Sequence, residues 1–171
     1  MQWLLIAGGV VGGLILLVFV IGALLPARHT FTRTTQLKQT PDAVFSLLAD
    51  VARLPEWNRH VAVVEVLTPV EGRKVTRQTF KGGMVMAVIT AESLRPSKLV
   101  RTMTDDKGPF AGTWSYEFVP VKGGCRVALT EQGEFRNPAF RALARVFGLT
   151  KYADEHLQDL AAKFRETAAI E

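Results

Sequence analysis

The sequence predicts an α+β fold in which a curved antiparallel sheet of about seven strands is followed by a long C-terminal helix and preceded by one transmembrane helix. Segments rich in β-branched and aromatic residues are separated by short turns containing glycine or proline. Asn137-Pro138 introduces a C-terminal segment with apolar residues at helical spacing. An N-terminal run has no charged residue. The chain is therefore predicted to divide into an anchor, residues 1–27, and a folded domain, residues 28–171.

The charge-free run from Trp3 to Leu25 is predicted to be a transmembrane anchor. At about 1.5 Å per residue, a helix of this length crosses a hydrocarbon core of roughly 30 Å. A cleaved signal peptide is the alternative, because Ile21-Gly22-Ala23 resembles a small-residue cleavage site. We favour the anchor, since the run exceeds the roughly 7–15 apolar residues of a signal peptide and no Lys or Arg precedes it.

Glycines inside this run raise the hypothesis that the anchor self-associates. Small residues four positions apart let membrane helices approach closely. The glycines with this spacing are Gly8, Gly9, Gly12 and Gly13. Glycine is also frequent in membrane helices generally, so both explanations remain open.

Charge and cysteine content predict where the folded domain lies. The net charge is +5, and the basic residues nearest the anchor, Arg28, Arg33 and Lys38, all follow it. The positive-inside rule then predicts a single-pass membrane protein with a cytoplasmic domain. Cys125 is the sole cysteine, so no disulfide can form within the chain. The basic residues are not gathered into a nucleic-acid module, so we expect no nucleic-acid partner, and their surplus suits a nearby anionic lipid surface.

The folded domain is predicted to begin with a strand and two short helices. Thr40 is a helix N-cap, Pro41 the first helical residue, and Asp42 lies near the positive end of the helix dipole. Pro55 is expected to end the regular structure, because proline disfavours helical geometry in the residue before it. A second short turn around Glu56-Trp57-Asn58 must follow at an angle.

Further strands follow the short helices and form a curved antiparallel sheet. Their separators are short enough to make antiparallel hairpins: Glu71-Gly72, Gly82-Gly83, Arg95-Pro96-Ser97, Asp105–Gly112 and Lys122-Gly123-Gly124. The predicted strands are Thr30–Lys38 before the helices and, after them, Val61–Leu67, Lys74–Phe80, Met84–Glu92, Lys98–Thr104, Thr113–Val119 and Cys125–Phe135.

The C-terminal segment is predicted to be a long helix that is interrupted near Gly148 and Thr150. Asn137 is the N-cap and Pro138 the first helical residue. Apolar residues recur at roughly 3.6-residue spacing, with charged residues between them. One face of this helix is therefore expected to pack and the other to meet water.

Short motifs along the domain resemble those of a known superfamily. They are Pro41-Asp42-Ala43-Val44-Phe45, Pro55-Glu56-Trp57-Asn58, Gly112-Thr113-Trp114, Leu129-Thr130-Glu131-Gln132-Gly133-Glu134 and Asn137-Pro138. In order and spacing, over residues 31–164, they resemble the START-like (SRPBCC) superfamily, most closely its polyketide cyclase/dehydrase-type members. The resemblance implies a helix-grip fold, in which the sheet wraps around the long C-terminal helix and the two short helices close one end.

Members of that superfamily commonly keep an apolar cavity between sheet and helix for lipids, sterols, polyketides or other hydrophobic molecules. Our leading interpretation is therefore membrane-anchored binding of a hydrophobic small molecule or lipid, without catalysis and without a cofactor. One alternative is a polyketide cyclase/dehydratase-like enzyme, and a second is a membrane-tethered protein-interaction module.

Candidate ligand-binding residues follow largely from strand alternation, which places every second side chain on one face. Aromatic residues at 114, 116 and 118 alternate with polar ones and are expected to face the long helix. Both faces of the strand after Gly83 are apolar, so alternation does not choose between them. Methionine suits an adaptable pocket and equally fills gaps in a dry core. The predicted ligand-binding residues are Trp57, Met84, Met86, Met103, Trp114, Tyr116, Phe118 and Phe147.

Candidate catalytic residues are Arg101, Tyr116 and Glu131, although a surface position is the default expectation for Arg101 and Glu131. In an enzyme of this kind a shaped cavity folds the substrate, and one or two polar groups move protons. No pair of histidines has metal-ligand spacing, so we expect no metal site.

Overall fold

The computed structural model describes residues 2–104, 108 and 110–171 of the chain. Helix α1 (Gln2–Leu24) comes first, then strand β1 (Arg28–Leu37), helix α2 (Pro41–Ala49) and a 3-10 helix, η1 (Val51–Glu56). The sheet continues with β2 (Val61–Val70), β3 (Arg73–Phe80), β4 (Val85–Leu94), β5 (Lys98–Met103), β6 (Phe110–Val121) and β7 (Gly124–Phe135). Helices α3 (Pro138–Phe147) and α4 (Lys151–Lys163) end the fold.

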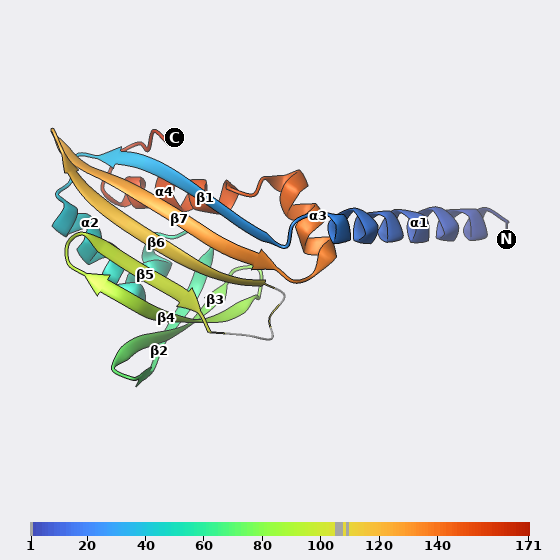
Figure 1. Ribbon diagram of the computed structural model, residues 1–171, viewed down its shortest axis with the longest axis horizontal. Coiled ribbons are helices and arrows are strands. Elements are labelled where there is room, and N and C mark those ends of the chain that lie inside the picture. Colours follow the sequence, from blue (N-terminus) through green and yellow to red (C-terminus); the bar gives the residue numbers. More distant parts are fainter. Residues whose placement is uncertain (1, 105–107, 109) are drawn as a thin grey trace.

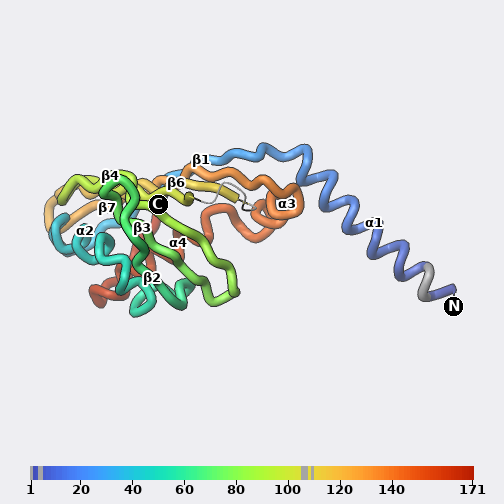
Figure 2. Tube along the Cα trace, turned by 90° about the horizontal axis from the view of Figure 1, so that it is seen from below, coloured from blue at the N-terminus to red at the C-terminus, as the bar shows by residue number. Residues whose placement is uncertain are grey.

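The seven strands form one sheet in the order β1-β7-β6-β5-β4-β3-β2, with every neighbouring pair antiparallel. The prediction of about seven antiparallel strands is thus confirmed. Helices α2 and α4 lie on the same side of the sheet, within its curve (Figures 1 and 2). Part of the predicted separator Asp105–Gly112, namely residues 105–107 and 109, lies outside the described residues.

Strands β2 and β6 extend beyond their predicted ends because their hairpins close in tight turns. Glu71 and Gly72 both have positive φ, at 50° and 74°, as a two-residue turn between twisted strands requires. β6 and β7 pair without a break from Phe110↔Phe135 to Val121↔Gly124.

Local signals set the start of α2 as predicted. The Thr40 side chain accepts a hydrogen bond from the Ala43 amide at 3.2 Å, and Pro41 is the first helical residue. Asp42 in the first turn also pairs with Arg95 at 2.6 Å. This ion pair attaches α2 to the turn between β4 and β5.

The prediction of one long C-terminal helix is wrong, because the chain forms two helices, α3 and α4. Asn137 caps α3 as expected, accepting from the Ala139 amide at 2.8 Å. Gly148 then adopts φ +93°, which ends α3 and redirects the chain. The interruption foreseen near Gly148 is therefore a full break, and only α4 packs within the sheet.

Helix α4 is joined to the sheet by a buried apolar face and by polar contacts at its margins. Ala153, Leu157, Leu160 and Ala161 are fully buried in the main core. Asp154 pairs with Arg33 of β1 at 2.5 Å, and Asp159 pairs with Arg59 at 2.8 Å. These contacts determine which face of α4 points inward.

Helix α1 projects away from the domain (Figures 1 and 2). The stretch Ile6–Leu24 is long and apolar enough to cross a membrane, a property that an anchor and an N-terminal signal sequence share. Most described residues of this stretch are exposed, but Gly22 is buried against Pro138 of α3. A β-carbon at Gly22 would lie 1.8 Å from the Pro138 carbonyl oxygen, so the two helices meet where only glycine fits.

The packing of α4 predicts the effect of two neighbouring substitutions. Leu157→Ala should lower the free energy of unfolding of residues 28–171 by about 2–5 kcal/mol, because it leaves a cavity in the core. Gln158→Ala, at the adjacent exposed position, should change it by less than about 0.5 kcal/mol. Urea unfolding measures both values. Equal effects of the two variants would contradict the placement of α4.

Candidate ligand-binding site

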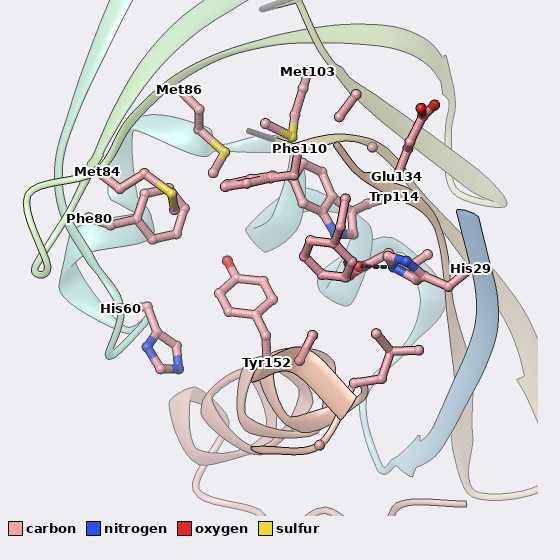
Figure 3. A pocket seen from close by; sticks show the side chains of 17 residues that line it. His29, His60, Phe80, Met84, Met86, Met103, Phe110, Trp114, Glu134 and Tyr152 are labelled. Carbon is pink, nitrogen blue, oxygen red and sulfur yellow. Dashed lines mark hydrogen bonds and ion pairs between the residues drawn. The ribbon is translucent and has the colours of Figure 1, made fainter. Parts of the chain in front are cut away.

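A cavity of about 370 Å³ lies between the sheet and the C-terminal helices, at the end of the domain from which α1 departs (Figures 1 and 3). Its walls come from strand ends, from α4 and from the link between α3 and α4. Lining residues are His29, His60, Phe80, Met84, Met86, Met103, Phe110, Ala111, Gly112, Trp114, Glu131, Glu134, Phe135, Ala144, Gly148, Leu149 and Tyr152. Most are apolar, so the cavity suits an apolar body.

The sheet contributes a group of sulfur-containing side chains on one side of the cavity. Met86 and Met103 are buried, and Met84 lies more openly at the β3–β4 turn. Tyr152 projects from α4 toward them from the opposite side (Figure 3). On β4 it is Met86 that turns inward whereas Val85 is exposed, which settles the choice that alternation left open. Flexible methionines let such a wall adapt to different shapes.

A carboxylate held by two donors forms a polar part of the wall. One Glu131 oxygen accepts from His29 Nε2 at 2.9 Å and the other from Trp114 Nε1 at 2.8 Å. The His29 ring stacks on Phe135, with centroids 4.9 Å apart, and lies over Gly133. A β-carbon at Gly133 would come within 2.3 Å of that ring. The glycine therefore makes room for the ring that orients Glu131.

Arg101 of β5 is buried, with 4% of its surface exposed, which corrects the expectation of a surface position. Its Nη2 donates to the Leu48 carbonyl, and its guanidinium lies 6.0 Å from the centre of the Tyr116 ring. Among the described residues no carboxylate forms an ion pair with it, and its Nε has no hydrogen-bond partner. Burial accordingly lowers the pKa of Arg101.

Next to Arg101, a chain of buried hydrogen bonds runs through His156. Asn58 Oδ1 accepts from the amides of His60 and Val61, which orients its Nδ2 to donate to His156 Nδ1 at 2.7 Å. His156 Nε2 then carries the proton and donates to the Tyr116 oxygen at 3.1 Å. Burial lowers the pKa of His156 to about 4 and raises the pKa of Tyr116 to about 12. Both groups are neutral at pH 7.

The Arg101 cluster adjoins the cavity. Arg101, Tyr116 and His156 line a hollow of about 30 Å³, and this hollow shares three walls with the larger cavity: Phe80, Trp114 and Tyr152. These three side chains lie between the cluster and the cavity. No group of His, Cys, Asp or Glu within the described part of the chain could hold a metal ion.

The structure brings four of the predicted ligand-binding residues to the cavity: Met84, Met86, Met103 and Trp114. Tyr116 lines only the small hollow. Trp57 packs against His156 with ring centroids 5.3 Å apart, and Phe118 packs edge-on against Phe45 in the core. Phe147 is 69% exposed on α3. Glu131 lines the cavity, whereas the candidate catalytic residues Arg101 and Tyr116 lie behind it.

Several cavity residues were missed from the sequence although signals existed. Tyr152 stands four residues before His156 and so shares its helix face. Phe110 lies in the predicted separator Asp105–Gly112, and only the structure pairs it with Phe135 across β6 and β7. His29 could not have been found this way, because its contact with Glu131 joins residues 102 positions apart.

Comparison with known proteins identifies the family. Residues 28–165 match the family described as polyketide cyclase / dehydrase and lipid transport. The chain belongs to this family. A comparison with curated proteins gives no match.

Solved structures of this family's fold include aromatase/cyclases. The Zhui aromatase/cyclase from Streptomyces sp. R1128 superposes with a TM-score of 0.67 at 14% identity, covering 81% of this chain and 94% of that one. The di-domain ARO/CYC StfQ from the steffimycin biosynthetic pathway superposes with a TM-score of 0.67 at 15% identity. The match covers 81% of this chain but only 52% of StfQ. Protein Ms6760 from Mycobacterium smegmatis superposes with a TM-score of 0.54 at 18% identity, and the match covers 80% of this chain and 90% of that one. The likeness to the aromatase/cyclase structures confirms a helix-grip architecture for the domain.

Burial of neutral His156 predicts an acid-sensitive fold. Its pKa is 6.5 in the unfolded chain and about 4 in the folded one. Between these pH values the unfolded chain binds the proton, so stability should fall as pH is lowered from 6.5 to 4, by up to about 3 kcal/mol. Urea unfolding of residues 28–171 across this pH range measures the loss. His156→Gln should flatten this part of the profile, and an unchanged slope would contradict the assignment.

Proposed function

We propose that this protein binds a hydrophobic small molecule or lipid in the cavity beside α4, at a membrane surface, and does not transform it. Residues 1–27 serve as the anchor and residues 28–171 as the binding domain. The family description, which includes lipid transport, supports hydrophobic ligand binding. The cavity carries the proposal, because it combines an apolar wall with one oriented carboxylate.

The size and chemistry of the cavity favour a compact amphipathic ligand. Its volume of about 370 Å³ is near the lower end of the roughly 300–1,000 Å³ of small-molecule pockets. Phe80, Phe110 and Met86 would bury the apolar body. Glu131, held by His29 and Trp114, would accept a hydrogen bond from a hydroxyl or amine of the ligand.

An anchored domain would stay beside the phase into which such a ligand partitions. Arg28, Arg33 and Lys38 follow the anchor, which supports a cytoplasmic domain beside anionic lipid. A β-carbon at Gly8, Gly9, Gly12 or Gly13 would meet no other part of the described chain within 4 Å, which leaves these positions open for self-association.

Native mass spectrometry of the full chain, released from a mild detergent after incubation with host lipid extract, tests ligand binding. We expect a defined hydrophobic adduct. Ala144→Trp should abolish the adduct, because Ala144 lines the cavity and the larger side chain fills it. Ala162→Trp is the matched control, because it makes the same substitution at an exposed alanine of α4 that does not line the cavity. A clean apo mass for the native chain, or equal adducts in both variants, would argue against this site.

A second candidate function, polyketide cyclisation or dehydration, is favoured by Arg101. A buried, unpaired cation beside a cavity is typical of functional sites, and the matched structures include aromatase/cyclases. The Arg101 guanidinium would stabilise an enolate oxygen, and Tyr116, whose pKa is raised to about 12, would donate a proton to a leaving hydroxyl.

Incubation with a poly-β-ketone thioester mimic, followed by mass analysis, distinguishes this enzyme from a carrier. An enzyme would release water from the substrate, and Tyr116→Phe should slow this step about 10²-fold or more while leaving substrate binding intact. A carrier would return the compound unchanged. Folding of the variant is checked by its circular dichroism spectrum.

A further inference from the structure

Helix α3 exposes a cluster of large apolar side chains. Phe140, Leu143, Val146 and Phe147 are 45%, 42%, 78% and 69% exposed. At helical spacing these positions share one side of the helix, whereas Arg141 and Arg145 lie on another. Arg145 is exposed, and Arg141 is half-buried and donates to the carbonyls of Phe135, Gly22 and Arg136. Such a face is unusual on a free surface, because exposed apolar patches mark contact sites.

The position of α3 shows what meets this face. Its first residue, Pro138, packs on Gly22 near the end of the apolar stretch Ile6–Leu24, and Arg141 Nη1 donates to the Gly22 carbonyl at 3.4 Å. The start of α3 is therefore level with the last turn of the membrane-spanning stretch. α3 runs across the direction of α1 rather than along it (Figures 1 and 2). A helix so placed lies in the plane of a bilayer that α1 crosses.

The charge around α3 also suits a bilayer surface. From Phe135 to Ala153 the chain has four basic residues, Arg136, Arg141, Arg145 and Lys151, and no acidic residue. Basic residues flanking an apolar face are the pattern of helices that lie in the headgroup region, with their apolar side in the acyl chains. Each such charge near anionic lipid contributes about 1 kcal/mol.

We propose that α3 is an interfacial helix that inserts Phe140, Leu143, Val146 and Phe147 into the lipid surface beside α1. This inference rests on the proposed anchoring role of α1. The partner is the anionic bilayer itself, since apolar face, basic flank and membrane-spanning helix all meet at this end of the molecule.

Insertion of α3 gives the cavity a route to the bilayer. Ala144 of α3, with Gly148 and Leu149 directly after it, forms part of the cavity wall. Gly148, at φ +93°, is the joint between the lipid-facing α3 and the buried α4. A ligand dissolved in the bilayer would reach Met84 and Phe110 by passing α3, without crossing water.

Lipid quenching of single fluorescent probes tests the proposal on the full chain. In a Cys125→Ala background, an environment-sensitive fluorophore is placed through Phe147→Cys on α3, Leu14→Cys on α1 or Val119→Cys on β6. Val119 is the matched control, an apolar side chain that is 40% exposed near the hairpin farthest from α1 (Figure 1). The protein is reconstituted in phosphatidylcholine/phosphatidylglycerol vesicles that carry a nitroxide on the acyl chains.

We expect several-fold greater fluorescence loss for the probes at 147 and 14 than for the probe at 119. Quenching at 14 but not at 147 would overturn the interfacial helix while leaving the anchor intact. Absence of quenching at 14 would remove the anchor and, with it, the basis of the inference. A probe at 147 that is shielded from aqueous iodide but not quenched by lipid would show that protein covers α3, and this also would overturn the proposal. Ligand binding, measured by mass spectrometry, is independent of all these results.

Discussion

The packing of α4 against one part of the sheet is the constraint on which the rest of the structure depends. Leu157 and Leu160 share one buried core with Leu48 of α2 and with Leu99 and Leu129 of the sheet. Toward α1 this close packing stops, because Gly148 breaks the helix and turns α3 outward. A helix continued straight through residue 148 would present its apolar residues to the sheet. The break instead leaves a space bounded by Tyr152 and the methionines of the sheet.

Polar groups inside this apolar shell are costly, and the structure treats two of them differently. Glu131 is satisfied by His29 and Trp114 and still lines the cavity. Arg101 is buried without a carboxylate, stabilised by a backbone carbonyl and the Tyr116 ring. The Glu131 arrangement suits recognition of a polar group on a ligand. The buried Arg101 charge would instead suit stabilisation of a negative charge that develops during a reaction. Because the family description names both cyclases and lipid transport, these two clusters, rather than the fold, distinguish the possible functions.

The features that support the proposed membrane attachment lie at one end of the molecule. Helices α1 and α3 meet there, whereas α2 and the β6–β7 hairpin lie at the other end (Figure 1). The cavity adjoins α3, because Ala144 lines it. The close contact between Gly22 and Pro138 links these elements mechanically. Membrane attachment and ligand access would therefore be properties of a single surface.

The sequence by itself determined the elements whose causes are local. Thr40 and Asn137 start helices because a side-chain oxygen needs only the next few amides, and Glu71-Gly72 makes its turn through its own backbone angles. The antiparallel pairing of consecutive strands from β2 to β7 followed from the short segments that join them, whereas the place of β1 beside β7 did not. Only the tertiary structure decided that Arg101 is buried, that Glu131 meets His29 across 102 positions, and that Phe147 faces outward while Tyr152 faces the cavity. Strand alternation and helical spacing fix relative faces, but the side on which α4 and α3 pack is set by contacts between residues far apart in the chain.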